Sequence, residues 1–179
     1  AFRAIEGFRA QVDCDADEDD YLCETRALVD LSGGENDQRR QSRNKFLRRH
    51  GISFQRNGSV SWADCDGVSS GWCAQRDCEG CGYRCPHETM RRAVAAADAI
   101  GARVLLMYMD GAPEALVVTG DMGGGTEDLL AICNRTRVEG LTYALIERAC
   151  RIAFPDAERL NLEEDMGLET LRHFKGLLK

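Results

Sequence analysis

The stretch RVLLMYMDGAPEALVVTG, residues 103–120, decides the fold class of this chain. Two apolar runs flank the dipeptide Asp110–Gly111, and an Asp-Gly pair between such runs is a strong signal for a two-residue hairpin turn. The stretch therefore predicts two antiparallel strands, at 103–109 and 114–120.

The sequence after this hairpin predicts further elements of the same sheet. DLLAICN, residues 128–134, reads as a third strand, and the amphipathic segment 139–154 reads as a long helix that stops before Pro155. A short strand is predicted at 157–163. The glycine-rich stretch 120–128 joins two strands and lacks a GK[ST] ending, so we interpret it as a hairpin loop and not as a phosphate-binding loop.

Outside these segments the sequence predicts mainly helices. The remaining predicted elements are helices at 21–34, 36–50, 86–100 and 167–179 and a second hairpin around Asn57–Gly58. Meandering strands followed by a strand–helix–strand crossover predict an α/β (α+β) fold, with a mixed, mostly antiparallel sheet flanked by helices. We expect a single domain over 1–179 with a Cys-rich insert at about 65–87.

Composition narrows the class of protein. The chain has 179 residues, 44% of them hydrophobic and 30% charged, which are globular proportions. No apolar run approaches the ~20 residues that span a bilayer. The net charge of −7 argues against a general nucleic-acid binder. Nine cysteines, an odd number, fit a reducing compartment better than a secreted disulfide scaffold, so we expect a cytoplasmic protein.

The cysteine-rich stretch CAQRDCEGCGYRC, residues 73–85, has the spacing C-x4-C-x2-C-x3-C. Four thiolates can close a tetrahedral shell around zinc, so we expect a structural zinc knot of Cys73, Cys78, Cys81 and Cys85. Cys65 or His87 could replace one ligand. The alternatives are an iron–sulfur cluster, with Cys133 or Cys150 as a distant fourth ligand, and free thiols or disulfides.

The order of elements, with NRTRVEGLTYALIERA following a strand, resembles the GNAT (N-acetyltransferase-like) fold. In that fold, backbone amides at the start of a helix hold the pyrophosphate of coenzyme A, as the helix dipole favours. The resemblance places this turn at Arg137, Gly140, Leu141 and Thr142, with Thr142 at a position where the motif has Gly or Ala.

A closer resemblance is to the GNAT-like family that also forms the C-terminal part of phosphatidylglycerol lysyltransferases. Two blocks carry it, and Thr170 stands where the family has Gly. The matching residues of the first block are Asp20, Tyr21, Leu22, Leu31, Gly33, Arg40, Asn44 and Phe46. Those of the second block are Asn161, Glu163, Asp165, Gly167, Leu171, Arg172 and Lys175.

The resemblance implies acyl or aminoacyl transfer from a thioester such as acyl-CoA, or from an aminoacyl-tRNA, to an amine or hydroxyl. Such a site needs a base and oxyanion donors, and Glu163 and Asp165, with Asn161 beside them, are the candidates for the base. Alternatively, the block is a turn in which Asp165 caps the last helix. Arg172 and Lys175 would bind a phosphate or carboxylate, or pair with neighbouring glutamates.

A basic helix offers a partner surface. Its cations, Arg39, Arg40, Arg43, Lys45, Arg48 and Arg49, would contact tRNA phosphates or an anionic lipid head group, or would form a solvated face. Two rival functions remain open at this point: a non-catalytic binding module that docks protein or RNA, favoured by Thr142, and an iron–sulfur redox module.

Overall fold

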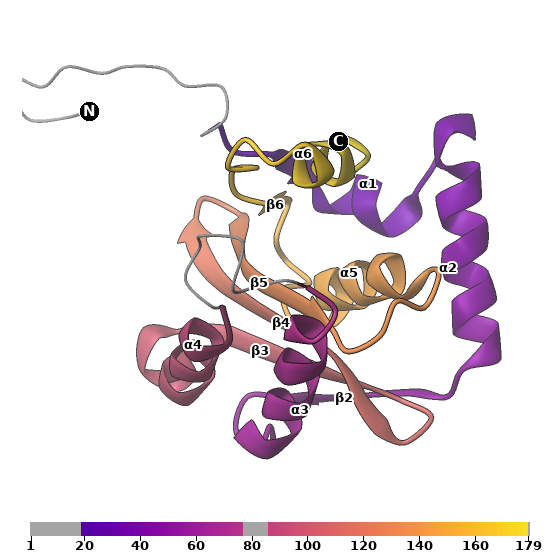
Figure 1. The fold of residues 1–179 in the computed structure, drawn as a ribbon. Coiled ribbons are helices and arrows are strands. Elements are labelled where there is room, and N and C mark those ends of the chain that lie inside the picture. Colours follow the sequence, from indigo (N-terminus) through magenta and orange to yellow (C-terminus); the bar gives the residue numbers. More distant parts are fainter. Residues whose placement is uncertain (1–18, 77–85, 179) are drawn as a thin grey trace, which may run out of the picture.

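The computed structural model describes residues 19–76 and 86–178. Its centre is a six-stranded sheet in the order β1-β6-β5-β4-β3-β2 (Figure 1). The strands are β1 Leu22–Glu24, β2 Ile52–Arg56, β3 Arg103–Met109, β4 Ala112–Gly123, β5 Thr126–Asn134 and β6 Arg159–Asn161. Neighbours pair antiparallel except β5 and β6, which are parallel. The mixed, mostly antiparallel sheet predicted from the sequence is therefore confirmed.

The hairpin at Asp110–Gly111 is confirmed as β3 and β4. Leu106 pairs with Leu116 across it, and Asp110 and Gly111 have φ angles of 52° and 86°. Positive φ at both central residues is what a type I′ turn requires, and its twist matches that of the flanking strands. The glycine-rich stretch also behaves as predicted, because it ends β4 and turns directly into β5.

The helices flank both faces of the sheet. They are α1 Thr25–Asp30, α2 Asp37–Arg49, α3 Trp62–Cys73, α4 Pro86–Ile100, α5 Leu141–Ile152 and α6 Glu169–Gly176, with a 3-10 turn η2 at Gly34–Asn36. The helix predicted at 21–34 is shorter than expected, since Leu22 belongs to β1. Helix α3 also means that the first part of the proposed insert at 65–87 is a regular element of the fold.

The hairpin predicted around Asn57–Gly58 is wrong. Only β2 forms there, and it pairs with β3, while the chain beyond Gly58 turns into α3. Ser61 caps that helix by accepting a hydrogen bond from the Asp64 amide. The Asn57 side chain does not form a hairpin turn but hydrogen-bonds to the Ala102 carbonyl and the Val104 amide. This fixes the start of β3.

Two hydrophobic clusters pack the two sheet faces. One face is covered by α1, α2 and α5, through residues such as Leu28, Phe46 and Leu145. The other is covered by α3 and α4, through Val68 and Met90. Figure 1 shows α3 and α4 on the opposite side of the sheet from α5. Within the described residues, none of the helices combines the length and apolar character that crossing a bilayer requires.

Candidate functional site

The candidate site lies where the parallel strands β5 and β6 part. Their pairing ends at Asp128 and Asn161, although β5 continues to Asn134. The chain beyond β6 follows β1 instead, because the Leu162 amide donates to the Tyr21 carbonyl at 2.9 Å. This divergence brings the two sequence blocks of the resemblance together, since Tyr21 belongs to the first and Asn161 to the second.

Glu163 is the most unusual residue of this region. Its φ angle is 61°, in the left-handed region that non-glycine residues rarely adopt. Its half-buried side chain shares a hydrogen bond with Asp128. Burial and the Asp128 carboxyl raise the pKa of Glu163 to about 7. Two carboxyl groups bond to each other only if one carries a proton, so this contact favours the protonated form of Glu163.

Asn161 and Lys175 fix the backbone on which Glu163 sits. Asn161 Oδ1 accepts from the Glu163 amide at 3.0 Å, and Asn161 Nδ2 donates to Asp20 at 2.9 Å. Lys175 Nζ donates to the carbonyl oxygens of Glu163 and Glu164, at 3.2 and 2.6 Å. These bonds hold Glu163 in the left-handed conformation. They use only backbone groups of Glu163, so its side chain is available to contact Asp128.

Asp165 is the centre of a separate, buried network. The residue is fully buried, and its carboxylate accepts from Arg172 Nε at 2.9 Å, from the Tyr21 hydroxyl at 2.6 Å and from the Gly167 amide at 2.9 Å. Arg172 and Tyr21 hold the pKa of Asp165 below its usual range. The residue that caps α6 is Leu168, which makes no side-chain capping bond. Asp165 therefore anchors the turn to α6 and to Tyr21 rather than capping the helix.

The structure thus separates the roles of the predicted site residues. Glu163 faces a carboxyl partner, Asp165 is saturated by structural bonds, and Arg172 and Lys175 both bond within the turn. A phosphate-binding role for the two cations stays a prediction. Asp128 is the residue that sequence reasoning missed, and its only signal was a carboxylate at the head of an apolar strand.

The turn predicted to hold a pyrophosphate packs against α2. Gly140 has φ 86°, and a Cβ there would collide with the Ser42 carbonyl. Thr142 Oγ1 accepts from Asn134 Nδ2 at 2.7 Å, and Arg137 donates to the Gln75 carbonyl at 3.0 Å. Leu141 is fully buried. These residues therefore order the start of α5, and anion binding by them stays a prediction.

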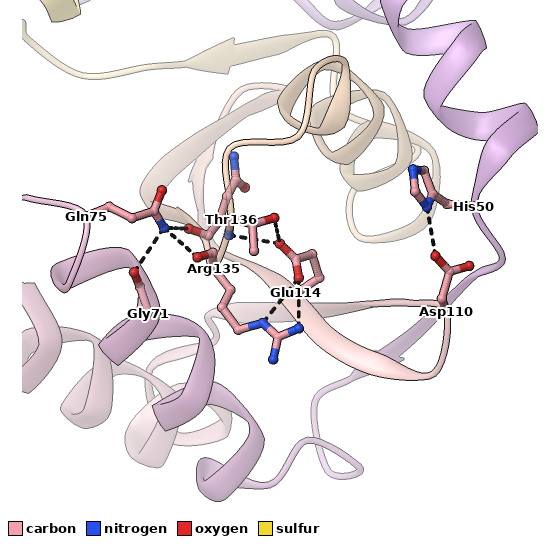
Figure 2. Close-up of polar contacts among 8 residues, drawn as sticks. His50, Gly71, Gln75, Asp110, Glu114, Arg135 and Thr136 are labelled. Atoms are coloured by element: carbon pink, nitrogen blue, oxygen red, sulfur yellow. Dashed lines mark hydrogen bonds and ion pairs between the residues drawn. The ribbon is translucent and has the colours of Figure 1, made fainter.

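A polar network secures that turn to the rest of the fold (Figure 2). Glu114, fully buried on β4, accepts from Arg135 Nε at 3.2 Å and from the Thr136 amide at 2.9 Å. Gln75 Nε2, beyond the end of α3, bonds to the carbonyls of Gly71 and Arg135. The end of β5 is thereby tied to β4 and α3. Figure 2 also shows His50 bonded to Asp110, which ties the end of α2 to the β3–β4 turn.

The basic helix, α2, does not present its cations uniformly. Three of them donate to backbone carbonyls at the C-terminal ends of α1 and α6. The last carbonyls of a helix have no partner within the helix, so these bonds stabilise the helix ends. These bonds are Arg39 to Leu177, Arg40 to Leu31, and Arg43 to Val29. Lys45 pairs with Glu139 at 3.7 Å. The predicted contact with tRNA is therefore narrowed to Arg48 and Arg49 at the end of the helix and stays a prediction.

Most of the predicted metal knot lies outside the described residues, namely Cys78, Cys81 and Cys85. Cys73 ends α3. Cys133 is buried beside Met90, and burial raises the pKa of its thiol to about 12, while Cys150 lies in the core on the other face of the sheet. Over 19–76 and 86–178, no three potential ligands gather to hold a metal. The zinc and iron–sulfur alternatives both stay predictions.

Comparisons with known proteins agree with this picture of the fold. A conserved protein of unknown function from Bacteroides thetaiotaomicron superposes with a TM-score of 0.79 at 22% identity, over 92% of this chain and 56% of the other. The structure of L-PGS from Bacillus licheniformis superposes with a TM-score of 0.61 at 13% identity, over 89% of this chain and 55% of the other. The C-terminal domain of a lysylphosphatidylglycerol synthetase candidate from Agrobacterium fabrum superposes with a TM-score of 0.56 at 20% identity, over 89% of this chain and 55% of the other.

These likenesses show the fold, and the chain spans little more than half the length of the solved relatives it matches. The comparison with curated proteins gives no match. The sequence profile described as phosphatidylglycerol lysyltransferase, C-terminal, matches residues 3–176. Because that match covers nearly the whole chain, the chain belongs to the family of phosphatidylglycerol lysyltransferase C-terminal domains.

Proposed function

We propose that this domain transfers an aminoacyl group from an aminoacyl-tRNA to an amine or hydroxyl acceptor, with Glu163 as the general base. The observation that carries the proposal is the Glu163–Asp128 carboxyl pair at the point where β5 and β6 part. A base is most effective when its pKa lies near the working pH, and the pKa of Glu163 is about 7.

The reaction balances with one proton moving through Glu163. The carboxylate takes the proton of the acceptor N–H or O–H as the acceptor attacks the ester carbonyl of the donor. The tetrahedral intermediate then collapses, the ester C–O bond breaks, and the proton passes from Glu163 to the leaving 3′-oxygen of the tRNA. Asp128 acts as a positioning residue, because its hydrogen bond orients the Glu163 carboxyl and, together with burial, raises the pKa of Glu163.

The developing oxyanion needs donors as well as a base. Pairing between β4 and β5 is irregular between Val118 and Gly120, directly beside Asp128. A bulge leaves backbone groups outside the regular ladder, so this stretch is where we place the oxyanion. The fixed geometry of the sheet would hold such donors without reorganisation during the reaction.

The choice of donor is supported by family membership. The family is described as lysyltransferases, and the relative from Bacillus licheniformis is an L-PGS. An aminoacyl ester carries a positively charged amine, which suits a site bordered by Asp20, Asp128 and Glu163. An acyl-CoA donor is the alternative, and for that donor the turn at Gly140 would have to admit a pyrophosphate.

The test is an assay of transfer with the purified protein. The donors are tRNAs charged with radiolabelled lysine or alanine, the acceptors are phosphatidylglycerol vesicles or small amines, and the product is detected by chromatography. We expect transfer with at least one pair, loss of transfer in Glu163→Gln, and retention in Glu164→Gln, which removes a charge from the adjacent residue. The rate should rise with pH through about 7 as the base ionises.

Three results would count against the proposal. Full activity of Glu163→Gln would exclude the base. Transfer from acyl-CoA alone would show that the donor is a thioester and not an aminoacyl-tRNA. If no donor is consumed and none raises the melting temperature, the domain is a binding module, since a bound donor must stabilise the native state.

A further inference from the structure

One row of paired residues crosses the sheet at the candidate site. Leu22 pairs with Asn161, Asn161 with Asp128, and Asp128 with Gly120. Directly paired residues on neighbouring strands point to the same face of a sheet and lie about 5 Å apart. The carboxyl pair Asp128–Glu163 is therefore bordered on the β4 side by a residue that has no side chain.

Among the described residues, the helices cover only part of the face that carries this row. Before Gly120 on β4, the same face holds Leu116 and Val118, which are both fully buried under α3 and α4. Around Gly120 two large apolar residues are exposed instead: Leu130 on β5 at 47% and Met122, two residues further along β4, at 58%. Met122 Sδ lies 3.8 Å from Asn161 Nδ2, so it borders the same row. Within the described part of the chain, Gly120 thus lies between the covered core and two exposed apolar side chains.

The backbone does not require glycine at this position. Gly120 is absent from the described residues with positive φ, so a side chain would adopt an ordinary strand conformation there. A Cβ would meet the Leu130 Cδ1 atom at 3.4 Å, which is ordinary contact. Since glycine weakens a strand interior and neither strain nor crowding calls for it, the missing side chain leaves space where a ligand can approach closely.

We propose that Gly120 determines substrate specificity: it leaves room for the side chain of the transferred aminoacyl group, whose aliphatic part lies on Leu130 and Met122. This inference rests on the proposed function. With the acceptor atom in hydrogen-bond reach of Glu163, the ester carbonyl lies beside the carboxyl pair, and the substituent on its α-carbon lies one step further away. On the β4 side that step leads to Gly120, one strand spacing from Asp128.

The test measures binding by non-hydrolysable analogues. The probes are adenosines with a 3′-amide-linked glycyl, alanyl, leucyl or lysyl group, titrated calorimetrically into the full chain. Gly120→Val should weaken the binding of the leucyl and lysyl analogues by about tenfold or more, because the added methyl groups occupy the space of the aminoacyl side chain. The affinity for the glycyl analogue should stay within about threefold of wild type. Gly120→Ala should fall between the two.

The matched control is Gly67→Ala, an exposed glycine of α3 where a Cβ meets nothing within 4 Å. It should change no affinity. If Gly120→Val fails to fold, Gly120→Ala carries the comparison, since its methyl group stays in ordinary contact. Equal losses for all analogues, or no loss in a folded variant, overturn the role of Gly120 and leave the proposed function standing. If the wild-type protein binds none of the analogues, the proposed function fails and this inference fails with it.

Discussion

Glu163→Gln should make the stability of this domain less sensitive to pH. The substitution keeps the shape of the side chain and the hydrogen bond to Asp128, but it removes the ionisable group. In the native state burial and Asp128 raise the pKa of Glu163 from 4.5 to about 7. Between these two values the unfolded chain releases a proton that the native state still holds, so the wild-type protein loses stability as pH rises.

The size of the effect follows from the same shift. Each pKa unit corresponds to about 1.4 kcal/mol, so the full shift would be worth about 3 kcal/mol. The side chain is only half-buried, and solvent screening reduces this value. We therefore expect the free energy of unfolding of Glu163→Gln, relative to wild type, to increase by about 1–2 kcal/mol between pH 4.5 and pH 8.

The assay is urea denaturation of both proteins at half-unit steps from pH 4.5 to pH 8.5. Glu164→Gln is the matched control, since it removes one negative charge from the adjacent position without touching the Asp128 bond. Asp128→Asn should reduce the wild-type dependence on pH without abolishing it, because burial still raises the pKa of Glu163 after the second carboxyl is gone. A difference between wild type and Glu163→Gln that is constant over this range, or that shrinks as pH rises, would refute the raised pKa of Glu163.

Other variants probe the surroundings. Arg172→Met should cost about 3 kcal/mol at pH 7 in denaturation, because it leaves the buried Asp165 carboxylate without its cation, and the cost should shrink in acid as that carboxylate is protonated. Arg43→Ala should destabilise by about 2 kcal/mol through its lost carbonyl bond, whereas Arg48→Ala should leave the melting temperature unchanged and weaken tRNA binding most at low salt. Elemental analysis should find about one zinc per chain, lost in Cys78→Ser; a brown protein absorbing near 400 nm, or a metal-free folded one, would contradict it.

Several features of the fold could be predicted from the sequence because their causes are local. The Asp110–Gly111 turn needs only two residues that accept positive φ, and both do so in the structure. The helix at 86–100 follows from an alanine-rich run that begins at a proline. The same local signal failed at Asn57–Gly58, because Ser61 caps a helix there and β3 takes the place of the expected partner strand.

The candidate site depended on tertiary structure. The sequence determined that Asn161, Glu163 and Asp165 form one block. Only the folded chain shows that Asn161 fixes the backbone, Glu163 contacts Asp128 and Asp165 binds Arg172. Asp128 meets Glu163 because parallel pairing of β5 with β6 places it beside Asn161, and no local pattern encodes the register of two distant strands. Likewise, arginines that form one basic helix in sequence are divided by their distant carbonyl partners into structural and exposed ones. Propensities act over a few residues, whereas the pKa of a carboxyl group depends on whatever the whole fold places next to it.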